Sequence, residues 1–103
     1  MPKTIVNGNI YLNFSISRDI SHPIDTSKMA AMLKNIRSRI KSIGSEAVLE
    51  DPVLGREDEG ISLVYSLSFP SHFDYLSCGS KVYLTIVKRT ASFLKDCEEK
   101  FPC

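Results

Sequence analysis

The sequence has none of the motifs by which cofactor sites and many active sites are recognised. Its five glycines occur singly, so it contains neither the GxGxxG pattern nor the GxxxxGK[ST] phosphate-binding loop. Its two histidines and three cysteines show no CxxC or HxxxH spacing, which argues against a zinc site. We therefore expect no metal, no cofactor and no enzymatic activity.

Features of exported and membrane proteins are missing as well. An odd number of cysteines without paired spacing predicts free thiols and no disulfide framework. The uncharged run over residues 61–71 is too short and too serine-rich to span a membrane. Because the first residues, MPKTIVNGN, do not form a signal-peptide pattern, we expect a cytoplasmic protein that does not bind membranes.

Tryptophan is absent and the net charge is only +1, so the chain as a whole is not built to attract a strongly charged partner. The charges are nevertheless unevenly distributed along the sequence. Every charged residue in residues 28–41 is basic, and every charged residue in residues 46–59 except Arg56 is acidic. The chain is therefore a charge dipole in sequence.

Length and composition predict one folded domain. The chain has 103 residues, of which 43% are hydrophobic and 24% are charged, values close to those of ordinary globular proteins. That length is enough for one hydrophobic core and too short for two. We expect a single domain over residues 1–103.

The clearest helical pattern covers residues 26–44. Its apolar residues recur at helical spacing and occupy one face. Asp25 and the two residues that follow it offer side-chain oxygens that cap a helix start, and Gly44 suits the left-handed residue that ends one. The expected buried residues are Met29, Met32, Leu33, Ile36, Ile40 and Ile43.

Strands are predicted on both sides of this helix. Apolar and polar residues alternate over residues 10–17 and again over 61–69, as in strands with one buried face. The pair Asn7-Gly8 predicts a tight turn that joins residues 3–6 to the strand that follows. A further strand over residues 46–54 is interrupted at Pro52, which predicts an edge strand, and residues 55–60, GREDEG, are expected to be a hairpin loop.

Two structures remain open for the last third of the chain. Residues 81–87, KVYLTIV, have the composition of a strand that a short helix could follow. On a helical wheel, however, apolar residues from Phe73 to Phe101 all fall on one side. This favours a single helix over residues 71–100, kinked or broken near Gly79. Ser71 and Asp74 fit a capping box at its start. The expected buried stripe is Phe73, Leu76, Tyr83, Val87, Ala91, Leu94, Cys97 and Phe101.

Together these elements predict an α+β fold in β-α-β-β-α order. An antiparallel sheet of three or four strands with both helices on one face buries every apolar stripe. We therefore expect a two-layer sandwich with a long C-terminal helix.

The polar face of the first helix is one candidate binding surface. Small residues there lie between cations, a pattern that suits a phosphate backbone, an acidic protein, or the acidic residues 46–59 of the same chain. The nucleic-acid alternative is weakened because no aromatic residue is interleaved with the cations. The candidate residues are Lys34, Asn35, Arg37, Ser38 and Lys41.

The outward positions of the two long strands form a second candidate surface. They carry no charge, although the solvent face of a sheet usually has lysine or glutamate. Such a face can be buried against another protein at little desolvation cost, and we expect a homodimer or a partner protein there. The candidate residues are Tyr11, Asn13, Ser15, Ser62, Val64 and Ser66.

The leading hypothesis is a small non-enzymatic interaction protein that acts as an inhibitor, adaptor or regulator through the sheet face and the first helix. Its size and plain composition are shared with phage-encoded inhibitors and toxin-immunity proteins, an analogy without a motif. A nucleic-acid-binding module that uses Lys34, Arg37 and Lys41 is the first alternative. A small enzyme that uses Cys78 and His72 is the second, although on a helix His72 and Asp74 point apart.

Overall fold

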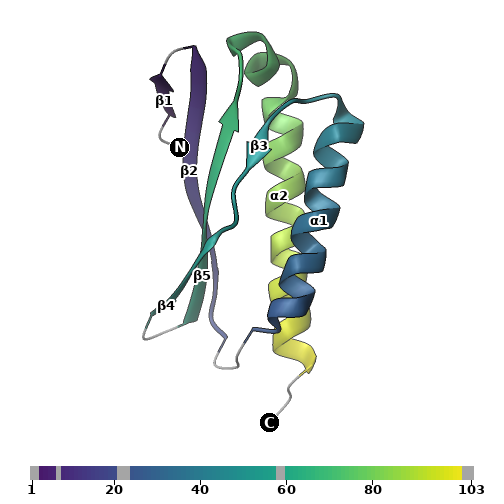
Figure 1. Ribbon diagram of the computed structural model, residues 1–103. Coiled ribbons are helices and arrows are strands. Elements are labelled where there is room, and N and C mark those ends of the chain that lie inside the picture. The colour runs from purple at the N-terminus through teal and green to yellow at the C-terminus, as the bar shows by residue number, and fades with distance from the viewer. Residues whose placement is uncertain (1–2, 7, 21–23, 58–59, 101–103) are drawn as a thin grey trace.

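The computed structural model describes residues 3–6, 8–20, 24–57 and 60–100 and shows a sheet packed against two helices (Figure 1). All strand pairs are antiparallel, and the sheet has five strands where three or four were expected. The predicted α+β class, the two layers and the long C-terminal helix are confirmed. The elements in chain order are β1 (Lys3–Val6), β2 (Asn9–Arg18), α1 (Thr26–Ile43), β3 (Val48–Leu49), β4 (Val53–Glu57), β5 (Gly60–Phe69) and α2 (His72–Lys100).

The sheet is built around the long pair β2 and β5. β1 pairs with one end of β2, in register with the predicted turn, and Gly8 has the positive φ of 81° that this turn needs; Asn7 lies outside the described residues. β3 and β4 pair with different parts of β5 along the opposite edge. The interruption between them contains Pro52, as predicted.

The expected GREDEG loop is partly wrong. Residues 55–57 continue β4, paired with residues 60–62 of β5, and residues 58–59 lie outside the described residues.

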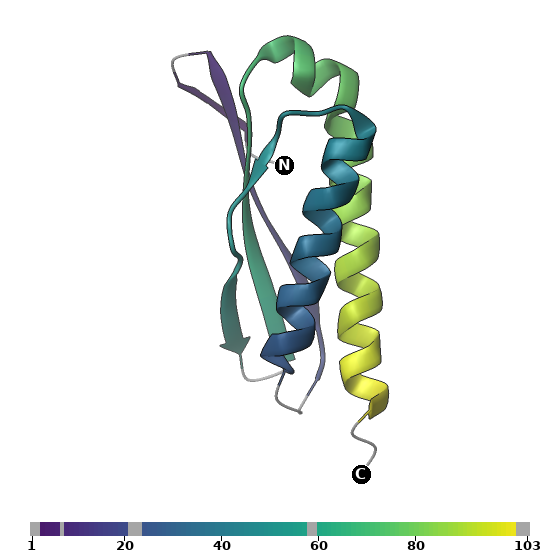
Figure 2. The ribbon, with the colours of Figure 1, turned by 45° about the vertical axis from the view of Figure 1, so that its right-hand side comes forward.

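Both helices cover the same face of the sheet and run side by side (Figure 2). α1 begins at the predicted cap, where Asp25 Oδ1 accepts the N–H groups of Ser27 and Lys28 at 3.0 and 3.2 Å. It ends at Gly44, whose φ of 93° is left-handed. Leu33, Ile36 and Ile40 are buried, as the helical pattern predicted.

α2 is one unbroken helix through Gly79, which decides between the two structures left open for residues 81–87. Ser71 Oγ accepts the Asp74 N–H at 3.1 Å, as in the predicted capping box. The reciprocal half of the box is absent from the contacts of the described residues, because the Asp74 carboxylate instead accepts the Glu46 N–H at 2.8 Å. The start of α2 is thereby tied to the segment that follows α1.

The predicted buried stripe of α2 is wrong, because the face that is buried is rotated about the helix axis from the predicted one. Leu94 and Cys97 are buried as expected, but Phe73 and Leu76 are 79% and 68% exposed; Phe101 lies outside the described residues. The buried face is turned toward α1, because α2 packs against that helix as well as against the sheet. Its buried residues in the middle and last turns are Val82, Ile86, Thr90, Phe93, Leu94 and Cys97.

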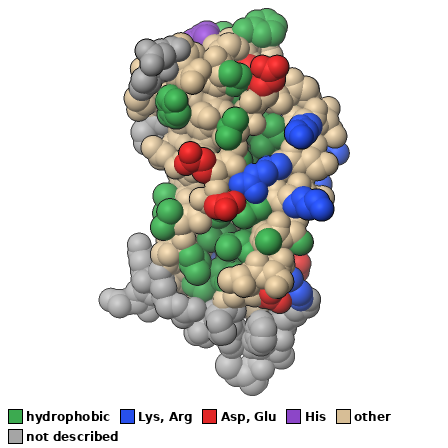
Figure 3. All heavy atoms as spheres, viewed as in Figure 1, with side chains coloured by type: hydrophobic (Ala, Val, Ile, Leu, Met, Phe, Trp, Pro, Cys, Tyr) green, Lys and Arg blue, Asp and Glu red, His purple; other side chains and the backbone are tan. Residues whose placement is uncertain are grey.

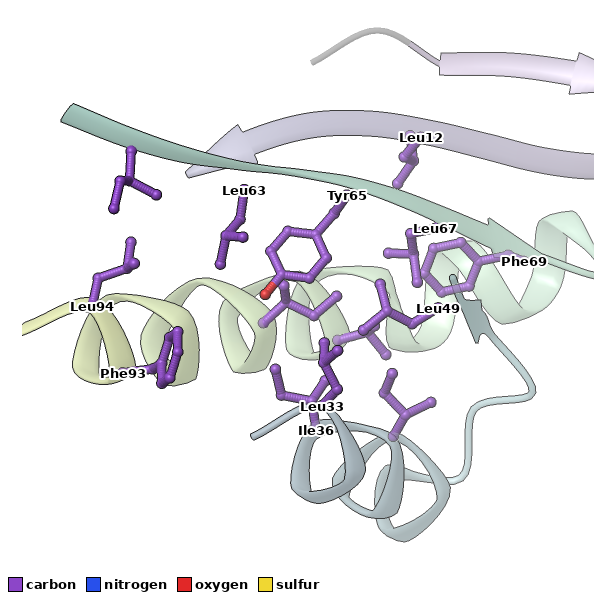
Figure 4. Packing of buried hydrophobic residues seen from close by; sticks show 14 of the residues in the cluster. Leu12, Leu33, Ile36, Leu49, Leu63, Tyr65, Leu67, Phe69, Phe93 and Leu94 are labelled. Atoms are coloured by element: carbon purple, nitrogen blue, oxygen red, sulfur yellow. The ribbon is translucent and has the colours of Figure 1, made fainter. Parts of the chain in front are cut away.

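A buried hydroxyl pair lies in the centre of this core. Tyr65 of β5 points between the sheet and the helices, toward Leu33 and Ile36 of α1 (Figure 4). Its hydroxyl lies 2.7 Å from Thr90 Oγ1 of α2, and both residues are fully buried. Burial raises the pKa of Tyr65, although the hydrogen bond with Thr90 opposes the shift, so the hydroxyl stays protonated.

This pair gives a first test of the core. Tyr65→Phe leaves the Thr90 hydroxyl buried without its partner and should lower the free energy of unfolding by about 1–3 kcal/mol. Thr90→Val should have a similar effect, and the double variant should cost less than the sum, because it removes both polar groups. Urea unfolding followed by circular dichroism measures all three; additive costs would contradict the pairing. Tyr83→Phe, at a half-buried position of the same helix, serves as the control.

Candidate functional site

The outward side chains of the sheet form a continuous surface, here called the outer face. The register places Tyr11 opposite Ser68, Asn13 opposite Ser66 and Ser15 opposite Val64, all pointing away from the helices. The residues of the outer face are Thr4, Tyr11, Asn13, Ser15, Ser17, Val48, Val53, Ser62, Val64, Ser66 and Ser68. The structure therefore brings together all six sheet residues that the sequence singled out.

The outer face is more apolar than the sequence indicated. Val48 and Val53 are 58% and 68% exposed, and Val53 lies directly opposite the exposed Val64. The sequence pattern missed both residues because the interruption at Pro52 hid the alternation of this edge. Ser62, by contrast, is buried, since β4 covers it: a Cβ added at Gly55 would lie 3.0 Å from Ser62 Oγ.

A shallow depression of about 420 Å³ occupies one end of the outer face. Tyr11 and Thr4 lie on one side of it and Glu50 on the other. Across its floor, Ser66 Oγ donates a hydrogen bond to Asn13 Oδ1 at 3.0 Å. The depression thus offers hydroxyl and amide groups that are already paired, with one carboxylate at the rim.

On α1, Arg37 is engaged within the chain. Its Nε and Nη2 donate to the Leu49 carbonyl at 3.1 and 2.7 Å, and Nη2 also contacts Asp51 Oδ1 at 2.8 Å. This agrees with the alternative in which a cation of α1 pairs with the acidic residues 46–59 of the same chain. The other candidates on the polar face, Lys34, Asn35, Ser38 and Lys41, are exposed.

The two candidate surfaces do not form one site. The outer face and α1 lie on opposite sides of the sheet (Figures 1 and 2). A single compact partner cannot cover the centres of both. Arg37 lies between them, where it joins α1 to the edge strand β3.

Positive charge extends from α1 onto α2. Figure 3 shows basic side chains over α1, with acidic ones beside them toward the sheet. α2 adds further exposed cations to the helix layer, and two acids of its last turns, Asp96 and Glu98, are exposed too. Glu98 is paired with Arg18 of β2. The exposed cations of α2 are Lys81, Lys88, Arg89 and Lys95.

A groove of about 360 Å³ runs between the two helices. Ala31 and Met32 of α1 and Phe93 of α2 contribute apolar surface to it, and Asn35 lies at its side. Charges of both signs line it, from Lys28 and Arg89 and from Asp25 and Asp96. The sequence did not indicate this groove, because its two walls come from helices far apart in the chain.

The suggested enzymatic residues lie at the start of α2. His72 is exposed beside Tyr75, with 6.3 Å between the ring centroids, and the Asp74 carboxylate is bonded to the Glu46 N–H. Burial and the neighbouring Asp74 carboxylate raise the pKa of the Cys78 thiol, whereas a nucleophilic cysteine needs a lowered pKa. Within residues 3–6, 8–20, 24–57 and 60–100, no group of three His, Cys, Asp or Glu side chains could hold a metal.

The reactivity of Cys78 tests this environment. At pH 8 its thiolate fraction should be smaller than that of free cysteine, so iodoacetamide should alkylate it more slowly, as followed by peptide mass spectrometry. Asp74→Asn removes the negative charge while keeping an acceptor for the Glu46 N–H, and should speed the reaction. Alkylation faster than that of free cysteine would instead indicate an activated thiol.

Of the residues described, no helix is both long and apolar enough to cross a membrane. Comparison of the chain with protein-family models, with curated proteins and with solved structures finds no match. The functional argument therefore depends on the geometry of the surfaces described above.

Proposed function

We propose that this chain is a small non-enzymatic protein-interaction domain, an inhibitor, adaptor or regulator, that binds through the outer face. The observation that carries the proposal is a broad sheet surface on which the outward positions of the two long strands, β2 and β5, carry no charge in the part that the structure describes, with exposed valines along one edge. A solvated sheet face normally carries charges that prevent association. Their absence here is what a binding face requires.

The energetics of the outer face favour association. Serine and asparagine side chains are cheaper to desolvate than charged ones, and Asn13 and Ser66 already satisfy one another. Exposed apolar area contributes about 25 cal/mol for each Å² that a partner covers. Val48, Val53 and Val64 therefore supply the gain, while the hydroxyl groups cost little.

We further propose that the partner on this face is a second copy of the chain. A dimer through the helix layer would bring two sets of cations together, and one through the β3/β4 edge would bring together Glu50 and Asp51 of both copies. On the outer face, by contrast, the described outward positions of β2 and β5 carry no charge, so little like-charge repulsion opposes a dimer there. With strands about 4.8 Å apart and about 3.3 Å per residue, the two ten-residue strands and the shorter β1, β3 and β4 offer about 490 Å² per copy, the size of a weak or transient interface.

We also propose that the protein acts in the cytoplasm. Cys78 and Cys97 are free thiols, and Cys97 is buried in the core next to the helix groove. Such thiols persist in a reducing compartment. An acidic protein remains an alternative partner for the exposed cations of α1.

Sedimentation of the full chain tests the dimer. The wild-type protein should sediment as a dimer, and Val53→Lys with Val64→Lys should make it monomeric, because two lysines would be buried against their own copies. Ser42→Lys, which adds the same kind of charge on α1, should leave the dimer intact. Circular dichroism checks that each variant is folded.

A monomeric wild-type chain at high concentration would overturn the dimer. The wider proposal is then tested by pull-down from the native cell with the wild-type chain and with the doubly substituted variant. Recovery of the same proteins by both would show that the outer face is not the binding surface.

Nucleic-acid binding is a second candidate, favoured by the joint basic surface of α1 and α2. About three phosphate contacts from Lys34, Arg39 and Lys41 predict a slope near −2 to −3 for log affinity against log salt. Fluorescence anisotropy with a DNA duplex and a single-stranded RNA measures it. Lys34→Glu with Lys41→Glu should abolish binding without disturbing the Arg37 contacts, and absence of binding in 50 mM salt would reject this function.

A further inference from the structure

The helix layer does not cover the whole inner face of the sheet. At the β1 edge, Ile5 lies opposite the fully buried Ile10 and so points to the inner side, yet it is 58% exposed. Beside it, the flank of α2 that faces away from α1 carries the exposed Phe73, Leu76 and Leu84. Phe73 and Leu76 belong to the predicted apolar stripe of α2 and Leu84 lies beside it, and the fold leaves all three exposed.

The uncovered region is concave. A depression of about 260 Å³ lies between the sheet and α2, lined by Leu12 of β2 and by Tyr75, Leu76, Gly79 and Tyr83 of α2. We call it, together with Ile5, Phe73 and Leu84, the α2 corner. The sheet forms one wall and the helix flank the other, so its shape suits a cylinder lying along α2.

The rim of the α2 corner is positively charged. Lys81, Lys88 and Lys95 recur every seven residues and therefore lie in one row along α2, next to Leu84. On the opposite wall, the Lys3 ammonium lies 4.9 Å from the centre of the Tyr75 ring. Glu98, farther along the helix, is already paired with Arg18.

We propose that the α2 corner binds an amphipathic helix of another protein whose apolar stripe is flanked by acidic residues. Its apolar side chains would contact Leu76, Tyr83 and Leu84, and its acids would pair with Lys88 and Lys95, in the helix-in-groove mode of recognition. The span from Phe73 to Lys95 is about 33 Å at 1.5 Å per residue, which matches a partner helix of about six turns.

The row of lysines on α2 favours an acidic helix over two other possible partners, a second copy of the chain and a membrane surface. A second copy paired along the same flank would place its own row of lysines against this row, and the like charges would repel each other. A membrane surface would attract the lysines but is flat, so it could not reach the floor of a concave corner. An acidic amphipathic helix satisfies both the shape and the charge.

The probe for this proposal is a synthetic peptide of about 22 residues with a leucine stripe at helical spacing and glutamate on both flanks. Isothermal titration with the full-length chain should show binding at low salt. A peptide with the same stripe and lysine flanks should bind at least tenfold more weakly, because its charges repel the row.

Two sets of variants test the position of the site. Leu76→Ser with Leu84→Ser should weaken binding about tenfold or more, as the loss of central apolar anchors does. Lys88→Glu with Lys95→Glu should weaken it similarly and reverse the preference between the two peptides. Ser42→Glu, which adds a negative charge on α1, should have no effect. All these positions are exposed, and circular dichroism checks the fold.

Binding of the acidic peptide that neither double variant weakens would overturn the proposal, as would equal binding of the two peptides. Failure of the acidic peptide to bind would overturn it too. Co-sedimentation with phosphatidylcholine–phosphatidylserine vesicles, lost in the Leu76 and Leu84 variant, would assign the corner to a membrane instead. Because the outer face is on the other side of the sheet, none of these results depends on the proposed dimer.

Discussion

The antiparallel register of β2 with β5 is the constraint on which the rest of the structure depends. It aligns Ile10 with Phe69 and Leu12 with Leu67, and so collects the apolar residues of both strands on one side. A slip of one residue would send every apolar side chain to the other face. Both helices then lie on the same side of the sheet, because that side carries the large apolar side chains of β2 and β5.

This one-sided packing creates the two surfaces that have functional interest. The outer face is left open and carries hydroxyl groups and valines in place of the usual charges. On the inner side, the two helices do not cover the full width of the sheet, so the α2 corner stays open at the β1 edge (Figure 2). Both openings follow from the number and placement of the elements.

Charge is segregated in space as well as in sequence. The helix layer carries most of the exposed cations, and Glu46, Glu50 and Asp51 lie toward the β3 edge. Arg37 links the two regions, since it binds both the Leu49 carbonyl and the Asp51 carboxylate. Two hydrogen bonds to one carbonyl make it a structural residue as well as a charged one, which removes it from the cations available to a partner.

The sequence by itself determined both helices' starts, the end of α1, and the face that each of the two long strands buries. Asp25, Gly44, Ser71 and the interruption at Pro52 act through local steric and hydrogen-bonding rules, and each is found where those rules place it. The outward serines and asparagine of the candidate surface were predictable for the same reason: alternation along a strand is local. Only the tertiary structure decided which part of the α2 stripe is buried, which partner Arg37 takes, and that α1 and the outer face lie on opposite sides. These depend on neighbours distant in the chain, because a helix with a wide apolar face can be rotated against its surroundings, and the packing of α1 beside α2 selects the rotation.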